Sequence, residues 1–380
     1  MSYQPVLPGQ TVGILGGGQL GRMFAIAARR LGYRVHAFDP TSDCPAGQVA
    51  DVEISASFED LAAARRFAAD VDVVTFEFEN IPAETLTAIA EVRPVHPAPH
   101  VLHICRHRLR EKDFLHNHGF PVAEYRAVHG AEELADALQV LGTPAILKTA
   151  EFGYDGKGQV RIEQASDVGS AWKHMGRALG VVERFVPFTK EISVICARSA
   201  AGAVVCYGPM ENVHQRHILD VTTSPADLAP HTTHQALELG RAITQALGVV
   251  GLLTVELFVV GDEILVNELA PRPHNSGHFT FDACVTSQFE QQLRAVCGLP
   301  LGDPQQLRPA AMANLLGDLW ANGEPNWFAA LASPEVKLHL YGKKDPRPGR
   351  KMGHLTVLAE SSSQARDRVL AARRALTAPG

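Results

Sequence analysis

The sequence lacks the features of several protein classes. Its six cysteines are scattered and include no C-x-x-C pair, which favours reduced thiols in a cytoplasmic protein over a disulfide framework or a zinc site. No basic segment followed by an apolar run opens the chain, so we expect no signal peptide. The longest apolar run, Val249–Val260, contains Glu256 and is too short to span a bilayer, so no membrane partner is expected. The net charge of −6 lacks the basic excess of a general nucleic-acid binder, which excludes nucleic acid as a partner and leaves any anionic ligand to local basic groups.

The length and composition fit a globular protein of several domains. A chain of 380 residues is too long for one simple core and suits two or three domains. The 46% hydrophobic and 20% charged content is ordinary for such proteins.

The N-terminal region has the pattern of a dinucleotide-binding fold. Thr11–Leu15 reads as a strand, a glycine turn spans Gly16–Gly21, and apolar residues then recur at helical spacing until Gly32. A second strand, Val35–Phe38, ends in Asp39. The glycines allow a phosphate to approach the helix N-terminus, so a nicotinamide cofactor is one interpretation and another phosphorylated ligand is a second. Tight packing of helix on strand is the third.

The end of the first domain is predicted from strand and proline signals. Val71–Phe76 reads as a further parallel strand, followed by Glu77, Glu79 and Asn80 at the sheet edge where ligands gather. We interpret these three residues as solvated loop residues or the cap of a helix starting near Pro82. Prolines 94, 97 and 99 indicate a linker, and the first domain is predicted to end near residue 105.

A lysine in an apolar strand precedes a second glycine-rich loop. Ala145–Ala150 reads as a strand that carries Lys148, and the loop at residues 152–159 follows with three glycines and a lysine. Such a loop offers N–H groups and a cation to phosphates as a cover, although it lacks the G-x-x-x-x-G-K-[ST] pattern of a P-loop. A hairpin turn is the alternative. Further strands at Val181–Val186 and Glu191–Cys196 place Glu183 and Glu191 at their ends, where an acid suits ribose hydroxyls or an amine.

A predicted hairpin carries two glutamates. Val255–Val260 and Ile264–Leu269 are strand-like and flank turn residues, so a three-residue turn symmetric about Asp262 would place Glu256 opposite Glu268, roughly 5 Å apart. Facing carboxylates favour a cation between them, and hard oxygen ligands favour Mg²⁺. A two-residue turn is the alternative, and it would place Asn267 opposite Glu256.

The last part of the chain contains a basic loop. Residues 342–353 read GKKDPRPGRKMG and lie between two strands predicted to pair, Val336–Tyr341 and His354–Ala359. Five basic residues against one aspartate, in a segment restricted by proline and glycine, favour an anion clamp over a solvated loop.

Taken together, these motifs resemble the ATP-grasp superfamily. The similarity is closest to the ligases that carboxylate aminoimidazole ribonucleotide, and it covers nearly the whole chain: GILGGGQLGRM, FGYDGKGQ, NVHQ, VNELAPRPHNSGH, SQFEQQLRA and RPGRKMGHL occur in order. The resemblance implies an α/β and α+β fold of three domains. These are a Rossmann-like pre-ATP-grasp domain with a parallel sheet (1–105), an ATP-grasp domain of two subdomains with a mobile loop at 152–159 (106–300), and a small β-rich C-terminal domain with the basic substrate loop (301–380).

The resemblance also implies a reaction and a site. Bicarbonate attacks the γ-phosphate of ATP, and the resulting carboxyphosphate delivers its carboxyl group to aminoimidazole ribonucleotide; Mg²⁺, or Mn²⁺ in its place, assists. Glu256 and Glu268 would hold the metal, and Lys148, Arg272 and His274 would be catalytic. ATP would be bound by Arg108, Lys148, Gly153, Tyr154, Asp155, Gly156, Lys157, Gly158, Gln159, Glu183, Arg184, Phe185, Val186, Glu191, His214, Asn267 and Glu268. The ribonucleotide would be bound by Gly18, Gln19, Leu20, Tyr154, Asp155, Lys157, Arg272, His274, Asn275, Ser276, Lys343, Arg350 and Lys351.

Two residues depart from the pattern of the superfamily. Many relatives carry asparagine two positions after the second glutamate, where this chain has Ala270, so no side-chain metal ligand is assigned there. Relatives often carry arginine at Lys157, and a lysine cannot make the bidentate contact of an arginine. A homodimer in the cytoplasm is expected from the resemblance alone. The competing hypotheses are a nicotinamide oxidoreductase, a non-catalytic nucleotide-binding regulator and a related ATP-grasp ligase acting on another purine intermediate.

Overall fold

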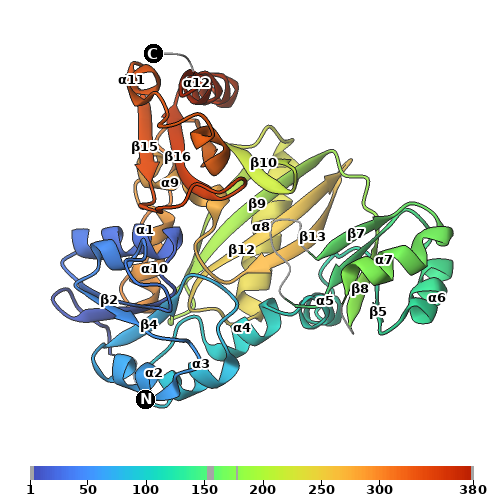
Figure 1. The fold of residues 1–380 in the computed structure, drawn as a ribbon, viewed down its shortest axis with the longest axis horizontal. Helices are drawn as coiled ribbons and strands as arrows, with labels where there is room; N and C mark the ends of the chain where they lie inside the picture. The colour runs from blue at the N-terminus through green and yellow to red at the C-terminus, as the bar shows by residue number, and fades with distance from the viewer. Residues whose placement is uncertain (1–3, 152–157, 177–178, 378–380) are drawn as a thin grey trace.

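The N-terminal part of the molecule is a parallel sheet with helices around it. The computed structural model describes residues 4–151, 158–176 and 179–377. Its first sheet has the strand order β3-β2-β1-β4, with every pairing parallel (Figure 1). The elements are β1 (Thr11–Leu15), α1 (Gln19–Arg30), β2 (Arg34–Asp39), β3 (Val52–Ser55), α2 (Leu61–Ala69), β4 (Val73–Phe76) and α3 (Ala83–Ala90). The predicted order of strand, glycine turn, helix and strand is confirmed.

The central feature is an eight-stranded antiparallel sheet. Its order is β13-β12-β9-β10-β11-β14-β16-β15, so strands from the last part of the chain extend the sheet that contains the glutamate hairpin (Figure 1). Its strands are β9 (Lys190–Arg198), β10 (Val204–Gln215), β11 (Ile218–Ser224), β12 (Gly251–Val260), β13 (Glu263–Ala270), β14 (Ala310–Leu316), β15 (Val336–Leu340) and β16 (Lys351–Leu358). The predicted pairing of the two strands around the basic loop is confirmed, since β15 and β16 pair antiparallel.

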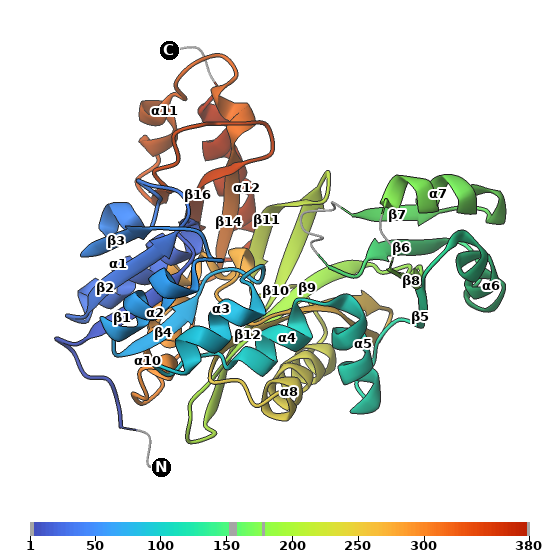
Figure 2. The ribbon, with the colours of Figure 1, turned by 60° about the horizontal axis from the view of Figure 1, so that its bottom comes forward.

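A smaller antiparallel sheet stands apart from the large one. Its order is β5-β8-β6-β7, and α6 and α7 cover one face of it (Figure 2). The elements are β5 (Tyr125–Val128), α6 (Ala131–Leu141), β6 (Ala145–Thr149), β7 (Gln159–Ile162), α7 (Val168–Met175) and β8 (Gly180–Arg184). Lys148 on β6 and Glu183 on β8 therefore lie on neighbouring strands.

The remaining helices connect these sheets. They are α4 (Pro99–Cys105), α5 (Arg108–Asn117), α8 (Pro230–Ala246), α9 (Thr280–Ala283), α10 (Gln288–Val296), α11 (Trp327–Leu331) and α12 (Ser362–Ala375). Apolar residues of α8 form a core with β9 and β12, and those of α12 form one with β14 and β16. Phe289, Leu293 and Val296 of α10 share a core with α1, so α10 joins the parallel sheet to the large sheet.

The proline-rich segment is part of the packed structure. Val95 bridges to Val74 of β4, and Pro99 begins α4, so the linker predicted at prolines 94, 97 and 99 is wrong. Proline is tolerated in the first turn of a helix because its missing N–H has no partner there in any case. The sequence pattern did not separate that use of proline from a flexible connection.

Candidate active site

A β-bulge determines which residues face each other in the glutamate hairpin. The turn has two residues, not the three that were predicted, because Val260 pairs with Glu263. The register then shifts by one at Asn267, which has no partner on β12, and Glu256 lies opposite Glu268. The predicted pair is therefore present, although the bulge produces it and the turn does not.

Each of the two glutamates has a basic partner. Oε1 of Glu256 lies 2.9 Å from Nε2 of His274, and Oε2 of Glu268 lies 3.1 Å from Nη1 of Arg108. Burial alone would raise the pKa of Glu256, but its hydrogen bond to His274 and the charges of His274, His214 and Arg272 lower that pKa to about 2. Glu256 is therefore ionised at neutral pH.

Charged side chains beside the hairpin form what we call the ionic cluster: Arg108, Glu111, Lys112, Lys148, Glu183 and Glu268. Four of them, Glu111, Lys112, Lys148 and Glu183, are buried, whereas Arg108 and Glu268 are partly exposed. The Glu183 carboxylate accepts from Nζ of Lys148 at 3.1 Å and lies 3.3 Å from Nζ of Lys112. Burial opposes the charge on Glu183, yet the two lysines hold its pKa at about 2, whereas burial lowers the pKa of Lys148. Lys112 and Lys148 thus share the single carboxylate of Glu183, and these three side chains together carry a net positive charge. This is the place where Lys148 was predicted to contact phosphate.

The hairpin offers the ligands that a divalent cation prefers. Two carboxylates face each other, and Oδ1 of Asn267 is buried without a hydrogen-bond partner in the structure. Within the described residues, no three His, Cys, Asp or Glu side chains gather as a complete metal site. An incomplete set of oxygen ligands fits Mg²⁺, which usually binds one or two carboxylates and completes its shell with water and substrate phosphates.

A second acid–base pair lies on the same sheet. Glu191 at the start of β9 forms an ion pair with Nδ1 of His214 on β10, and Asn212 is the register partner of Glu191. Burial would lower the pKa of His214, but the hydrogen bond and charge of Glu191 raise it. Glu191 and His214, which were predicted to surround ATP, are therefore in direct contact.

The three residues at and after the end of β8 have side-chain contacts of their own. Arg184 is half exposed and pairs with Glu124 at 2.7 Å, while the Phe185 ring lies 4.3 Å from the guanidinium of Arg161. Val186 is buried. The Arg184 side chain thus points to the surface, and ATP binding by this segment stays a prediction for its backbone.

The second glycine-rich loop is described only at its end. Gly153, Tyr154, Asp155, Gly156 and Lys157 lie outside the described residues. Gly158 accepts a backbone hydrogen bond from Thr149 at 2.7 Å, and Gln159 begins β7 with its amide 3.2 Å from Nδ1 of His217.

The first glycine turn is occupied by carboxylates of the chain itself. The N–H of Gly17 donates to Asp39 at 2.7 Å, and the N–H groups of Gly18 and Gly21 donate to Glu77 at 2.6 and 2.9 Å. Burial raises the pKa of Glu77, which the two backbone donors and Lys343 partly offset. The amides expected to hold a phosphate therefore already bind carboxyl groups of the chain. Interpreting Glu77 as a solvated or capping residue is wrong, because its carboxylate lies beneath the turn of a distant segment.

The basic loop meets this glycine turn. Nζ of Lys343 donates to the Gln19 side chain at 2.7 Å and to the backbone oxygen of Lys351 at 2.8 Å. Arg350 donates to the Asp345 backbone within its own loop at 2.9 Å. The structure thus brings Gln19, Lys343 and Lys351 together, whereas the Leu20 side chain is buried in the core and offers only its backbone.

Arg272 pairs with a residue that the sequence analysis set aside. Its Nε lies 2.6 Å from Oε1 of Glu79, beyond the end of β4. Burial would lower the pKa of Arg272, but the charge and hydrogen bond of Glu79 raise it. Glu79 was interpreted as solvated, and that interpretation is wrong; the signal available was its position at the carboxyl end of a parallel strand.

The two polar residues after His274 are buried in hydrogen-bonded pairs. The side-chain amides of Asn275 and Asn314 exchange hydrogen bonds of 2.7 and 3.1 Å, and Ser276 accepts from Ser193 at 2.8 Å. Nδ1 of His274 lies 2.8 Å from the Ser276 hydroxyl, which fixes the ring with Nε2 toward Glu256. His274 thus orients the Glu256 carboxylate, and metal binding by that carboxylate and proton transfer by His274 stay predictions.

Beside this segment lies what we call the imidazole cluster: His278, His339, Tyr341 and His354. The rings of His339 and His354 stack with centroids 4.5 Å apart, and Tyr341 Oη lies 2.8 Å from Nδ1 of His354. His278 and His354 are fully buried, and burial moves the pKa of each well below its usual value. His278 and His354 are therefore neutral at physiological pH.

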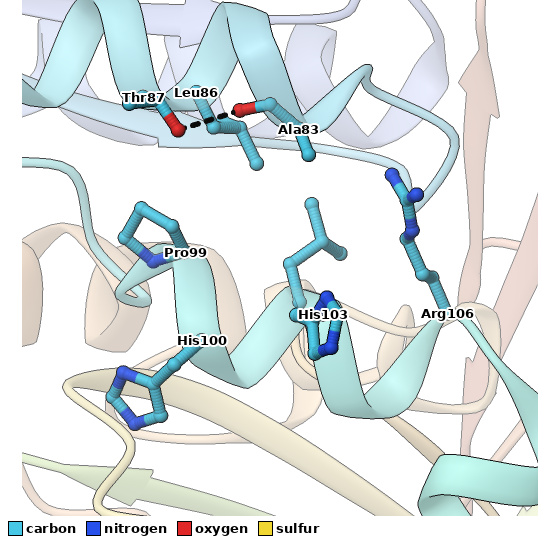
Figure 3. Close-up of a pocket in the computed structure, with 8 residues that line it drawn as sticks. Ala83, Leu86, Thr87, Pro99, His100, His103 and Arg106 are labelled. Atoms are coloured by element: carbon cyan, nitrogen blue, oxygen red, sulfur yellow. Dashed lines mark hydrogen bonds between the residues drawn. The ribbon is translucent and has the colours of Figure 1, made fainter.

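A cavity of about 210 Å³ lies between α3 and α4, and none of the predicted site residues lines it. Figure 3 shows its lining, which includes Leu86 and Thr87 on one side and Pro99, His103 and Arg106 on the other. The guanidinium of Arg106 donates to the backbone oxygen of Ile81 at 3.1 Å and so forms part of the cavity wall.

Comparison with known proteins gives matches along the chain. Three family models match in succession: the ribonucleotide synthetase preATP-grasp domain over residues 9–106, the ATP-grasp domain over 113–289 and the phosphoribosylaminoimidazole carboxylase C-terminal domain over 310–368. The N5-carboxyaminoimidazole ribonucleotide synthase of Bacillus subtilis is 42% identical over 96% of this chain and 95% of its own. The bifunctional purine synthesis protein purC/E of Dictyostelium discoideum is 43% identical over 92% of this chain, which spans only 37% of that longer protein.

Solved structures agree with these matches. An N5-carboxyaminoimidazole ribonucleotide synthetase in complex with ADP superimposes with a TM-score of 0.91 at 41% identity, covering 98% of both chains. The Aspergillus clavatus synthase in complex with ADP and aminoimidazole ribonucleotide gives 0.89 at 31% identity, covering 97% of this chain and 98% of the other. Among the described residues, no helix is both long and apolar enough to cross a membrane.

Proposed function

The chain belongs to the N5-carboxyaminoimidazole ribonucleotide synthase family, and from that premise we propose that it carboxylates aminoimidazole ribonucleotide with ATP and bicarbonate, releasing ADP and phosphate. This is a step of purine synthesis and makes the protein a ligase that forms a C–N bond. The observation that carries the proposal is the opposition of Glu256 and Glu268 beside the buried cations of the ionic cluster.

The ATP end of the site is assigned to the hairpin and the ionic cluster. Glu256 and Glu268 would hold Mg²⁺, or Mn²⁺, and the ion would offset charge on the ATP phosphates. Buried Lys148 and partly buried Arg108 contribute fixed positive charge to the same phosphates, where Coulomb interactions are stronger than in water. Glu191, oriented by His214, accepts from the ribose hydroxyls.

The transfer end of the site is assigned to Arg272 and the basic loop. A bicarbonate oxygen attacks the γ-phosphorus as ADP leaves. The C–O bond of carboxyphosphate then breaks and releases CO₂ and phosphate. The exocyclic amine of the ribonucleotide bonds to the CO₂ and gives its proton to that phosphate. Arg272, held by Glu79, pairs with the carboxylate of the intermediate. Lys343, Lys351 and Gln19 provide the polar contacts for the ribonucleotide phosphate. Water must be excluded because carboxyphosphate hydrolyses readily, and the loop at 152–159 is assigned that role.

The same proposal includes the domain boundaries, the location and the oligomeric state of the protein. The domain boundaries near residues 105 and 300, the cytoplasmic location and the homodimer are retained, and light scattering after size-exclusion chromatography tests the dimer. A nicotinamide oxidoreductase has little support, because the amides of the first glycine turn are taken by Asp39 and Glu77. Titration of NADH fluorescence with no binding would discard it.

A phosphate-release assay with Mg²⁺-ATP tests the function. We expect phosphate release to require bicarbonate and to rise with aminoimidazole ribonucleotide, with ¹³C from labelled bicarbonate appearing in the carbamate. Glycinamide ribonucleotide and formate serve as alternative substrates, and preference for either would assign the chain to a related ligase. No phosphate release with any of them would favour the non-catalytic regulator.

Glu268→Gln tests the metal site within this function. The change keeps the size of the side chain and removes one charge from the pair, so kcat/KM is expected to fall about 10²–10³-fold, as when one positioned electrostatic group is lost. Glu263→Gln removes an exposed carboxylate from the same strand and is the matched control. Normal turnover in Glu268→Gln would refute the metal assignment while leaving the substrates open.

A further inference from the structure

The bulge at Asn267 decides what faces Glu256. From the turn up to the pair Leu257 and Val266, the hairpin follows the register of a two-residue turn. Continued without interruption, this register would pair Asn267 with Glu256. A shift of one residue along a strand exchanges the faces on which its side chains lie, so the pairing partner of Glu256 depends on the bulge. The bulge is therefore the feature that brings the second carboxylate, Glu268, to the metal-facing position.

A bulge leaves backbone groups without their usual partners, and here helix α5 supplies them. The strand β13 is the edge strand of its sheet, and on its outer side the N–H of Val266 donates to the C=O of Pro121 at 2.8 Å, where Val122 bridges to Val266. The bulge begins one residue beyond this bridge, where α5 takes over. Glu111 Oε2 accepts from the N–H of Leu269 at 2.8 Å, and Nζ of Lys112 donates to the C=O of Asn267 at 3.0 Å. Two consecutive side chains of α5 thus bind the residue before Glu268 and the residue after it.

Both of these side chains are costly to bury. Glu111 is 2% exposed and Lys112 is fully buried, and an ionisable group in such a place destabilises the protein unless it is well partnered. Lys112 is also 3.3 Å from Glu183, but Glu111 makes a single side-chain hydrogen bond among the described residues, and that bond goes to the bulge. Arg108, one turn earlier on the same face of α5, reaches the Glu268 carboxylate itself.

We propose that Glu111 and Lys112 are positioning residues that hold the bulge and so place Glu268 opposite Glu256 to bind a divalent cation. The role of the cation rests on the proposed function. The contacts to Leu269 and Asn267 set the register, and Arg108 then orients the carboxylate that the register has delivered.

The test compares variants of Glu111 by Mn²⁺ binding to the whole protein in the presence of ADP, followed by electron paramagnetic resonance. Glu111→Leu removes the acceptor for the Leu269 N–H and is expected to weaken Mn²⁺ binding at least 10-fold, the range seen when groups that support a metal ligand are lost. Glu111→Gln keeps an acceptor of the same length and is expected to bind within about 3-fold of wild type. Faster hydrogen exchange at the Leu269 amide in Glu111→Leu alone would report the bulge directly.

Gln292→Leu is the matched control. The fully buried Gln292 accepts from the N–H of Leu252 at 2.7 Å, so this change also removes a buried side-chain acceptor from the same hairpin, far from the bulge. It is expected to lower stability and leave Mn²⁺ binding unchanged. If Glu111→Leu does not fold, Glu111→Asp replaces it, because the shorter carboxyl group no longer reaches Leu269.

The outcomes separate this proposal from the proposed function. Wild-type Mn²⁺ binding in a folded Glu111→Leu or Glu111→Asp protein overturns the positioning role, as does equal weakening in Gln292→Leu. Failure of wild type to carboxylate aminoimidazole ribonucleotide would overturn the function instead, and the binding measurement would still test the bulge.

Discussion

The ionic cluster and the imidazole cluster both join distant parts of the chain through buried polar groups. In the ionic cluster, α5, β6, β8 and β13 contribute charges of opposite sign, and each charge depends on a specific neighbour. In the imidazole cluster, the partly exposed ring of His339 stacks on His354, and burial keeps His278 and His354 neutral. Removing a buried charged side chain should therefore leave an uncompensated charge in the first cluster, whereas removing His354 or the Tyr341 hydroxyl from the second costs contacts and leaves no such charge.

The largest effect is expected from Glu183→Leu. This change removes the carboxylate that Lys112 and Lys148 share, and breaking a buried ion pair on one side costs about 3–5 kcal/mol. Urea denaturation measures the loss. Glu124→Leu, which breaks the exposed pair with Arg184, is the control and should change stability by less than about 1 kcal/mol. Equal effects of the two changes would contradict the distinction between buried and exposed pairs.

Acid should act on the imidazole cluster first. Because folding lowers the pKa of His278 and His354, their contribution to stability is complete above the unfolded value near 6.5 and is lost as the pH falls below it, by about 1.4 kcal/mol per pH unit for each ring. Glu111 has the opposite effect on stability between pH 4.5 and 8. Burial raises its folded pKa to about 8, so the folded state binds the proton more tightly and stability rises as the pH falls through this range. The measurement is therefore a difference: between pH 6.5 and 5, stability should fall less steeply in His354→Gln than in wild type. Identical slopes would show that His354 is not held neutral by the fold.

The smallest effect is expected from Tyr341→Phe. The change removes the hydroxyl that meets Nδ1 of His354 and keeps the ring, so the loss is about 1–2 kcal/mol, as for one buried neutral hydrogen bond. Urea denaturation at pH 7.5 measures it. A loss as large as that in Glu183→Leu would remove the contrast between the two clusters.

The sequence predicted features whose cause is local. The apolar strand Thr11–Leu15, the glycine turn after it and the helical spacing of α1 are short-range patterns, and the structure has each of them. The hairpin of β12 and β13 is also local, and its two strands appear where expected. Side-chain alternation and turn residues are sufficient for elements of this kind.

Features that depend on contacts between residues far apart in the sequence were either not predicted or predicted correctly for the wrong reason. Glu77 binds Gly18, 59 positions away, and nothing in the strand before Glu77 indicates this partner. The opposition of Glu256 and Glu268 was predicted from a symmetric turn, whereas the structure achieves it with a bulge held from α5, 158 positions before Leu269. The strand β3 was not predicted because it is an edge strand with little burial, so its sequence has no apolar run to reveal it.

The pairing of β14 with β11 limits how this protein can be divided. Ser224 to Val221 of β11 pair with Ala310 to Ala313 of β14, so the last strands complete the sheet that also contains β9 and β12. A fragment that stops before Ala310 would bare the N–H and C=O groups along β11, and such a border recruits strands from other copies. Split reporters, truncated genes and fusions should therefore leave Ile218–Leu358 uncut. A cut within this range would expose strand edges and lower the solubility of the protein, whatever its effect on catalysis.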